Sequence, residues 1–261
     1  MTMSYLDSLF NLKGKVAVVI GGTGELCGQV AIGLAKAGCE VVISGRDEAK
    51  AGEKLDVIEA AGGRAYYVEA EVTERGSIEA LVDIVSERSG RIDILINGAG
   101  INNDTAIEHI GDVELDAIFE VNFNGAFRTC QIFANYFIQR DRPTSIINIG
   151  AISGLTPLSN RYVHSASKAA LHNLTRNLAR EWAEYDIRVN TLIPGFFPAS
   201  QSNTMLDDAR VLEILRKTPS SRFGNPEELI GAALLLSSHG AGSFITGSEI
   251  VVDGGFNATS I

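Results

Sequence analysis

Short apolar runs alternate with amphipathic stretches along most of the chain. Apolar runs rich in Val and Ile predict buried strands at residues 15–20, 40–44, 65–70, 92–96, 145–149, 187–193 and 249–252. Apolar residues at helical spacing predict helices at residues 29–37, 48–61, 77–88, 114–140, 165–185 and 226–237. This alternation is typical of a doubly wound α/β fold, in which a parallel sheet carries helices on both faces and binds ligands at the carboxyl ends of its strands.

Length and charge narrow the possible functions. With 261 residues, 45% of them hydrophobic, the chain suits one domain over residues 1–261. Its net charge of −10 disfavours nucleic acid and anionic membranes as partners. Residues 1–15 lack the layout of a signal peptide, and no apolar run reaches membrane-spanning length. Cys27, Cys39 and Cys130 are not spaced as metal ligands, so we expect reduced thiols, no metal site and a cytoplasmic location.

A glycine-rich turn follows the first predicted strand. Gly21, Thr23, Gly24 and Leu26 lie between this strand and a predicted helix. Small residues in such a turn let backbone N–H groups and the start of a helix approach a pyrophosphate. The order of strand, turn and helix therefore predicts a dinucleotide site.

Segments further along the chain extend this pattern. Asn97-Gly98-Ala99-Gly100 follows the fourth strand, Asn122 lies in a predicted helix, and the segment 165–170 surrounds Lys168. In their order, these segments and those at 188–195, 222–227 and 246–255 resemble the short-chain dehydrogenase/reductase family over residues 12–256. The resemblance implies a Rossmann-type sheet, a nicotinamide dinucleotide and a small-molecule substrate. The segments 21–26 and 194–197 also resemble the branch of reductases for sugar acids such as mannonate and fructuronate.

The resemblance also implies which residues contact the dinucleotide. They are Gly21, Thr23, Gly24, Leu26, Arg46, Glu71, Val72, Asn97, Gly98, Ala99, Lys168, Pro194 and Phe196. Gly45 stands where a carboxylate would bind the ribose of NAD, and Arg46 offers a clamp for a 2′-phosphate. We therefore expect NADP as the preferred cofactor and NAD as the alternative. Glu25 and Cys27 replace two glycines of the family's turn, and these changes would weaken dinucleotide binding.

The catalytic positions match the family only in part. The family uses Asn, Ser, Tyr and Lys, and Asn122 and Lys168 match the first and the last of these. Ala151 stands at the position of the serine. His164, four residues before Lys168 on the same helix face, stands at the position of the tyrosine. The expected catalytic set is therefore Asn122, His164 and Lys168.

Two neighbouring side chains are candidates for the missing groups. Tyr162 lies six residues before Lys168, so on a helix it would point about 120° away from the lysine. Ser153 comes two places after the serine position, so we expect it to pack in its loop. His164 itself offers an imidazole, which the charge of Lys168 would keep mostly neutral at pH 7. A neutral imidazole is a ready general base and a poor general acid.

Three functions remain open. The first is an NADP-dependent oxidoreductase with altered catalytic residues, acting on a small polyol or a sugar-acid-like alcohol or ketone. The second is a non-redox dehydratase, epimerase or lyase that uses His164 as its base. The third is a catalytically silent nucleotide-binding or scaffold homologue. The family also implies a homodimer or homotetramer packed through the helices at 114–140 and 165–185.

The segment 196–219 is expected to form the lid over the substrate. It carries a mixture of apolar and polar side chains, Phe196, Phe197, Gln201, Asn203 and Met205. No arginine precedes Arg210 in this segment, so it does not by itself predict capture of a carboxylate.

Overall fold

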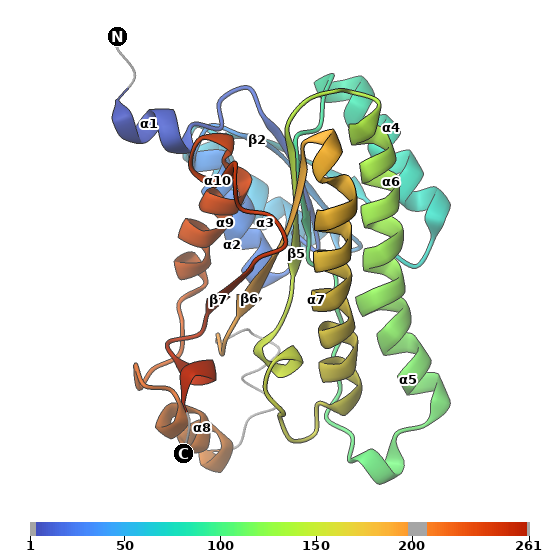
Figure 1. Cartoon of the computed structure of the whole chain (residues 1–261), viewed down its shortest axis with the longest axis vertical. Coiled ribbons are helices and arrows are strands. Elements are labelled where there is room, and N and C mark those ends of the chain that lie inside the picture. Colours follow the sequence, from blue (N-terminus) through green and yellow to red (C-terminus); the bar gives the residue numbers. More distant parts are fainter. Residues whose placement is uncertain (1–3, 198–207, 260–261) are drawn as a thin grey trace.

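One parallel sheet forms the centre of the protein. The computed structural model describes residues 4–197 and 208–259. The strands are β1 (Val16–Ile20), β2 (Glu40–Gly45), β3 (Arg64–Glu69), β4 (Ile94–Asn97), β5 (Thr144–Ile149), β6 (Ile187–Pro194) and β7 (Glu249–Val252). They pair in the order β3-β2-β1-β4-β5-β6-β7, and every pair is parallel. The predicted doubly wound α/β fold is thereby confirmed (Figure 1).

Helices cover both faces of this sheet (Figure 1). The longer ones are α2 (Glu25–Lys36), α3 (Glu48–Ala60), α4 (Arg75–Ser89), α5 (Asp112–Phe119), α6 (Ala126–Ile138), α7 (Tyr162–Trp182), α8 (Asp208–Lys217) and α9 (Ile230–Ser237). Helices α2, α3 and α9 pack on one face, and α4, α6 and α7 pack on the other. The core accordingly has two layers: Val18 and Ile20 of β1 point into one, and Ala17 and Val19 into the other. A strand buried on both faces reads as a continuous apolar run, which is why the sequence reveals it.

Several helices differ from the prediction. Helix α2 begins at Glu25 instead of residue 29, because the backbone of Gly24 is extended and acts as its N-cap. Helix α7 begins at Tyr162 instead of residue 165, so it contains the whole stretch from Tyr162 to Lys168. The predicted helix 114–140 is interrupted by a π-helical segment, Glu120–Gly125, between α5 and α6. The short helices α1 (Tyr5–Phe10) and α10 (His239–Gly242), and α8, were not predicted.

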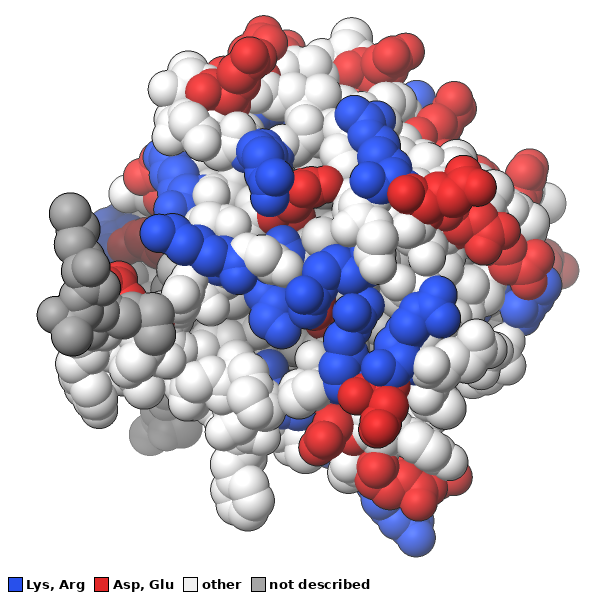
Figure 2. Space-filling view, turned by 90° about the horizontal axis from the view of Figure 1, so that it is seen from above, with Lys and Arg blue, Asp and Glu red and all other residues white. Residues whose placement is uncertain are grey.

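The amino ends of the strands carry a basic cluster, although the chain as a whole is acidic. Figure 2 shows Lys and Arg side chains gathered in the middle of this face. Lys15, Arg91 and Arg142 lie within 4.0 Å of the buried Asp93 carboxylate. Asp93 also accepts a hydrogen bond from the backbone N–H of Val16, at 3.0 Å. The cluster thus ties together the starts of β1, β4 and β5, on the opposite side from the carboxyl ends of the strands.

No helix among residues 4–197 and 208–259 combines the length and the apolar character needed to cross a membrane.

Candidate functional site

The turn between β1 and α2 approaches the end of β4 very closely. Gly21 has a φ of +75°, and a Cβ atom built on it would lie 2.8 Å from the carbonyl carbon and oxygen of Gly98. Only glycine fits both the left-handed backbone and this approach. Gly24 caps α2 without a side-chain hydrogen bond, so no capping side chain covers the N-terminus of this helix, where an anion would bind. The turn therefore fits the pyrophosphate of a dinucleotide.

Arg46 lies directly after β2, where the ribose of a bound dinucleotide would be. Its side chain is 72% exposed, and its Nη1 is 3.3 Å from Oε2 of Glu71, which follows β3. A Cβ atom on Gly45 would lie 2.8 Å from Oγ1 of Thr23, so a carboxylate side chain has no room at this position. Nη1 of Arg46 holds Glu71, and an exposed ion pair of this kind is weak, so it would oppose the binding of a phosphate only slightly.

Cys27 fills the space that a glycine would leave open in the turn. Its Sγ lies 4.0 Å from the carbonyl oxygen of Gly98, and a Cβ atom on Gly98 would be only 2.2 Å from this sulfur. Burial raises the pKa of the Cys27 thiol to about 11, so the thiol is neutral and acts as a packing group. The neutral thiol therefore adds no negative charge beside the pyrophosphate.

Two expected contact residues use their side chains inside the protein. Asn97 is buried, and its Nδ2 donates to the carbonyl oxygen of Ala126 at 3.1 Å and to Oδ1 of Asn148 at 3.2 Å. Val72 is buried in the core and packs on Gly125, where a Cβ atom would lie 2.9 Å from it. These two residues thus hold the strand ends in place through their side chains.

Asn122 connects the segment after β4 with helix α7. It is fully buried in the π-helical segment Glu120–Gly125. Its Oδ1 accepts from the N–H of Ile101 at 2.8 Å, and its Nδ2 donates to the carbonyl oxygen of Ile101 at 2.9 Å and to Oγ of Ser167 at 3.1 Å. Ser167 in turn donates to the carbonyl oxygen of His164 at 2.7 Å. π-Helical turns of this kind are frequent at functional sites.

Lys168 and Asn122 both approach Gly100, just after the carboxyl end of β4. A Cβ atom on Gly100 would lie 3.5 Å from Nζ of Lys168 and 3.4 Å from Oδ1 of Asn122. The ammonium group donates to the carbonyl oxygen of Ile149 at 2.8 Å. Burial lowers the pKa of Lys168 to about 8. A lysine of this kind can hold or release a proton near neutral pH.

His164 is paired with Ser153. Nδ1 of His164 lies 3.1 Å from Oγ of Ser153, and Ser153 is 7% exposed. The expectation that Ser153 only packs in its loop is therefore wrong. Nε2 of His164 has no hydrogen bond to any described residue. Burial, followed by the charges of Lys168 and Arg161, lowers the pKa of His164 to about 3, so the ring is neutral at pH 7 as expected.

Tyr162 does not take the place of the missing tyrosine. It is the first residue of α7, so the helical spacing applies and its side chain points away from the face of Lys168. The residue as a whole is 38% exposed.

The sequence interpretation missed two residues beside the site. His172 is 2% exposed, and its Nε2 accepts from the N–H of Ala151 at 3.4 Å. It lies four residues after Lys168, so its place on the helix face of His164 and Lys168 was readable from the spacing. Arg161 precedes α7, donates to the carbonyl oxygen of Asn103 and lies 3.7 Å from Asp104. No spacing rule reveals Arg161, because a loop places it.

The expected lid is described only in part. Phe196 packs edge-to-face on Phe256 with ring centroids 5.1 Å apart, and Phe197 is buried. Pro194 ends β6 and is buried. Gln201, Asn203 and Met205 lie outside the described residues.

Comparison with known proteins agrees with this geometry. A family model described as enoyl-(acyl carrier protein) reductase matches residues 26–257. The chain belongs to the short-chain dehydrogenase/reductase family. The resemblance noted in the sequence is thereby confirmed, together with a nicotinamide dinucleotide as the cofactor of the family.

Its relatives include enzymes of sugar-acid metabolism. The chain is 37% identical to an uncharacterised oxidoreductase, UxuB, of Bacillus subtilis, covering 96% of this chain and 97% of that protein. It is 33% identical to gluconate 5-dehydrogenase of Gluconobacter oxydans, covering 98% and 100%. The crystal structure of a gluconate 5-dehydrogenase from Burkholderia cenocepacia, in complex with NADP and tartrate, has a TM-score of 0.92 at 31% identity, covering 98% of this chain and 100% of that one.

Proposed function

We propose that this protein is an NADP-preferring oxidoreductase that interconverts an alcohol and a ketone in a small polyol or sugar acid. The observation that carries the proposal is the hydrogen bond between Ser153 and His164, in a site that keeps Asn122 and Lys168. Ser153 offers a hydroxyl two residues after Ala151, where the family has its serine. His164 offers an imidazole at the position of the family's tyrosine. The family's alcohol–ketone chemistry therefore has a substitute for the missing groups.

His164 would act on the substrate oxygen through Nε2, since Nδ1 is engaged by Ser153. With the proton on Nδ1, Nε2 accepts a hydrogen bond from the hydroxyl of an alcohol, and the hydroxyl proton itself passes to the neutral amine of Lys168 as the hydride leaves. With the hydroxyl of Ser153 donating to Nδ1, Nε2–H donates a hydrogen bond to the oxygen of a ketone, and the proton that the resulting alkoxide needs comes from the ammonium group of Lys168. When bound, the dinucleotide accepts or supplies the hydride. Lys168, with its pKa near 8, is the group in this site best suited to exchange the proton with solvent.

The preference for NADP rests on Gly45 and Arg46. Gly45 supplies no carboxylate for a ribose diol, and Arg46 is exposed and, within the described part of the chain, paired with Glu71. A 2′-phosphate carries more charge than the Glu71 carboxylate and accepts two parallel hydrogen bonds from a guanidinium. The protein contacts proposed for the rest of the dinucleotide are Gly21, Thr23, Gly24, Leu26, Glu71, Val72, Asn97, Gly98, Ala99, Lys168, Pro194 and Phe196.

A sugar acid as substrate is supported by the relatives and by charge. Several relatives are dehydrogenases of gluconate or of 2-dehydro-3-deoxy-D-gluconate. Arg161 and Lys168 are the cations whose charge reaches His164, so the surroundings of the ring are positive. A carboxylate on the substrate would be attracted to this part of the site.

The proposal is tested by following NADPH absorbance in both directions with a panel of sugar acids and their keto forms. We expect slow but saturable turnover, well below roughly tens per second, because a neutral imidazole is a poor general acid. His164→Ala and Lys168→Ala should abolish it, and Tyr162→Phe should leave it unchanged. Tight NADPH binding with no turnover of any acid would instead support the catalytically silent homologue. Conversion of an acid without any dinucleotide, dependent on His164, would support the non-redox enzyme.

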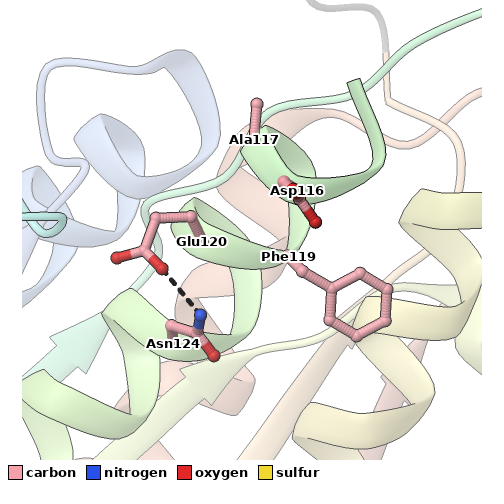
Figure 3. A pocket seen from close by; sticks show the side chains of 5 residues that line it. All are labelled: Asp116, Ala117, Phe119, Glu120 and Asn124. Atoms are coloured by element: carbon pink, nitrogen blue, oxygen red, sulfur yellow. Dashed lines mark hydrogen bonds between the residues drawn. The ribbon is translucent and has the colours of Figure 1, made fainter. Parts of the chain in front are cut away.

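A homodimer or homotetramer packed through α5, α6 and α7 remains part of the proposal. Val113 and Phe127 on these helices are 85% and 43% exposed. A surface pocket on α5 and the π-helical segment is lined by Asp116, Ala117, Phe119, Glu120 and Asn124 (Figure 3). Phe127→Asp should lower the mass measured by light scattering, and an unchanged mass would point to another face. We also propose a cytoplasmic location, because Cys27, Cys39 and Cys130 are free thiols.

A further inference from the structure

The turn that carries Ser153 is wrapped around the imidazole ring of His172. A Cβ atom built on Gly150 would lie 2.3 Å from Nε2 of this ring, and one built on Gly154 would lie 2.8 Å from its Cε1. Between these glycines, the N–H of Ala151 donates to Nε2 at 3.4 Å. The ring is 2% exposed and therefore fills the space inside the turn.

The same turn lies directly on the backbone of α7. The Cβ atom on Gly154 would also lie 3.0 Å from the amide nitrogen of Ala169 and 3.1 Å from the carbonyl carbon of Lys168. Ser153 sits within this turn, in the short 3-10 helix Ile152–Gly154, one residue before Gly154. Because both flanking glycines are pressed against His172, the ring sets the distance from Ser153 to His164.

The hydrogen bond from the N–H of Ala151 also selects the tautomer of the neutral His172 ring. Nε2 accepts, so the proton of the neutral ring is on Nδ1. Nδ1 is buried and has no hydrogen-bond partner among the described residues. Burial, followed by the charges of Lys168 and Arg176, lowers the pKa of His172 to about 4, which keeps the ring neutral. The Ala151 N–H is meanwhile turned inward and is not offered to a substrate.

We propose that His172 is a positioning residue, which holds Ser153 against His164 by accepting the Ala151 N–H and by filling the space between Gly150 and Gly154. The inference rests on the proposed function, because it identifies the residue that holds together the Ser153–His164 pair on which that function depends. It gives His172 a role through another residue and not through contact with the substrate. The chain has four histidines, so each ring signal can be assigned by a single substitution.

The test compares His172→Gln with His172→Leu in the full-length protein. Glutamine can place an acceptor near the position of Nε2, whereas leucine fills similar space without one. The first readout is the ¹⁵N chemical shift of Nδ1 of His164 in histidine-labelled protein without substrate, with Ser153→Ala as the reference for a broken pair. We expect His172→Leu to move this shift to the Ser153→Ala value and His172→Gln to keep the wild-type value.

The second readout is turnover of the acid substrate found in the panel above. His172→Leu should lower kcat on the order of 10- to 100-fold with little change in KM, as misplacement of a reacting group does, and His172→Gln should restore most of it. A folded His172→Leu protein with the wild-type His164 shift would overturn the inference, even if it is inactive. If leucine prevents folding, His172→Met replaces it in the same comparison. The shift needs no substrate, so it still decides the inference if the proposed oxidoreductase activity is not found.

Discussion

Removal of the Ser153 hydroxyl is the sharpest perturbation of the proposed chemistry. In Ser153→Ala, Nδ1 of His164 loses the hydroxyl that lies 3.1 Å away. The ring stays buried, as its lowered pKa reflects, so Nδ1 is left without this partner in a buried place. An unpaired buried polar group costs about 1–3 kcal/mol. If this loss falls on the reacting complex, kcat drops by about 5- to 150-fold, because 1.4 kcal/mol corresponds to a factor of ten. KM and the affinity for NADPH should change little, since Ser153 is not among the proposed cofactor contacts.

The assay is steady-state oxidation of NADPH with the best keto acid of the panel, beside NADPH binding by calorimetry. Ser159→Ala is the matched control, because Ser159 is an exposed serine in the same segment between β5 and α7. Thermal unfolding checks that both variants are folded. Wild-type kcat in a folded Ser153→Ala protein would refute the reasoning, because the pair would then have no part in the reaction. A parallel loss in Ser159→Ala would show that the effect belongs to the loop.

Three further predictions concern the cofactor, the repaired site and acid stability. Arg46→Ala should weaken NADPH binding about 10- to 100-fold, the value of a charged hydrogen bond, and NADH binding much less; equal losses in calorimetry would contradict the NADP preference. Ala151→Ser with His164→Tyr should raise ketone reduction by a few orders of magnitude and each single change by much less, because such groups act as a unit; a double variant that binds NADPH and reduces nothing would place the defect elsewhere. The pKa of His172 is about 4 when folded and about 6.5 when unfolded, so its contribution to stability is complete above pH 6.5 and is lost as the pH falls toward 4. In urea titrations between pH 7 and 4, the free energy of unfolding of His172→Gln should fall by up to about 3 kcal/mol less than that of the wild type. An equal fall in both proteins would contradict this assignment.

The sheet and its order of helices could be read from the sequence because β1, β2, β4, β5 and β6 are buried on both faces over most of their length. The edge strands β3 and β7 are partly exposed, but they still read as short apolar runs. Helix α1 was not predicted, because it buries none of its residues and so shows no apolar face in the sequence. The start of α2 was missed because glycines read as a turn, while here Gly24 caps the helix and Gly28 lies inside it. These misses are local, and neither changed the predicted topology.

The candidate site was likewise predictable from the sequence only in part. The placement of His164 and Lys168 followed from a spacing of four residues on one helix, which sequence alone fixes. The contact of Ser153 with His164 depends on how the turn from Gly150 to Gly154 wraps around a side chain further along the chain. Such a contact is set by tertiary packing, and no local pattern contains it.

The exchange of a phenol for an imidazole changes the consequence of the Lys168 charge for the chemistry of the site, although the charge lowers the pKa of either group. A cation beside a tyrosine lowers the phenol pKa from about 10 toward neutrality, which makes the group a better proton donor and acceptor at pH 7. At His164, burial and then the same cation lower a pKa that is already near neutrality, and the value falls to about 3. The ring therefore stays neutral and acts as a hydrogen-bonding group. Lys168 is the group of this site that titrates near neutral pH. Ser153 gains importance for this reason, because the tautomer of a neutral ring is set by the partner of its other nitrogen.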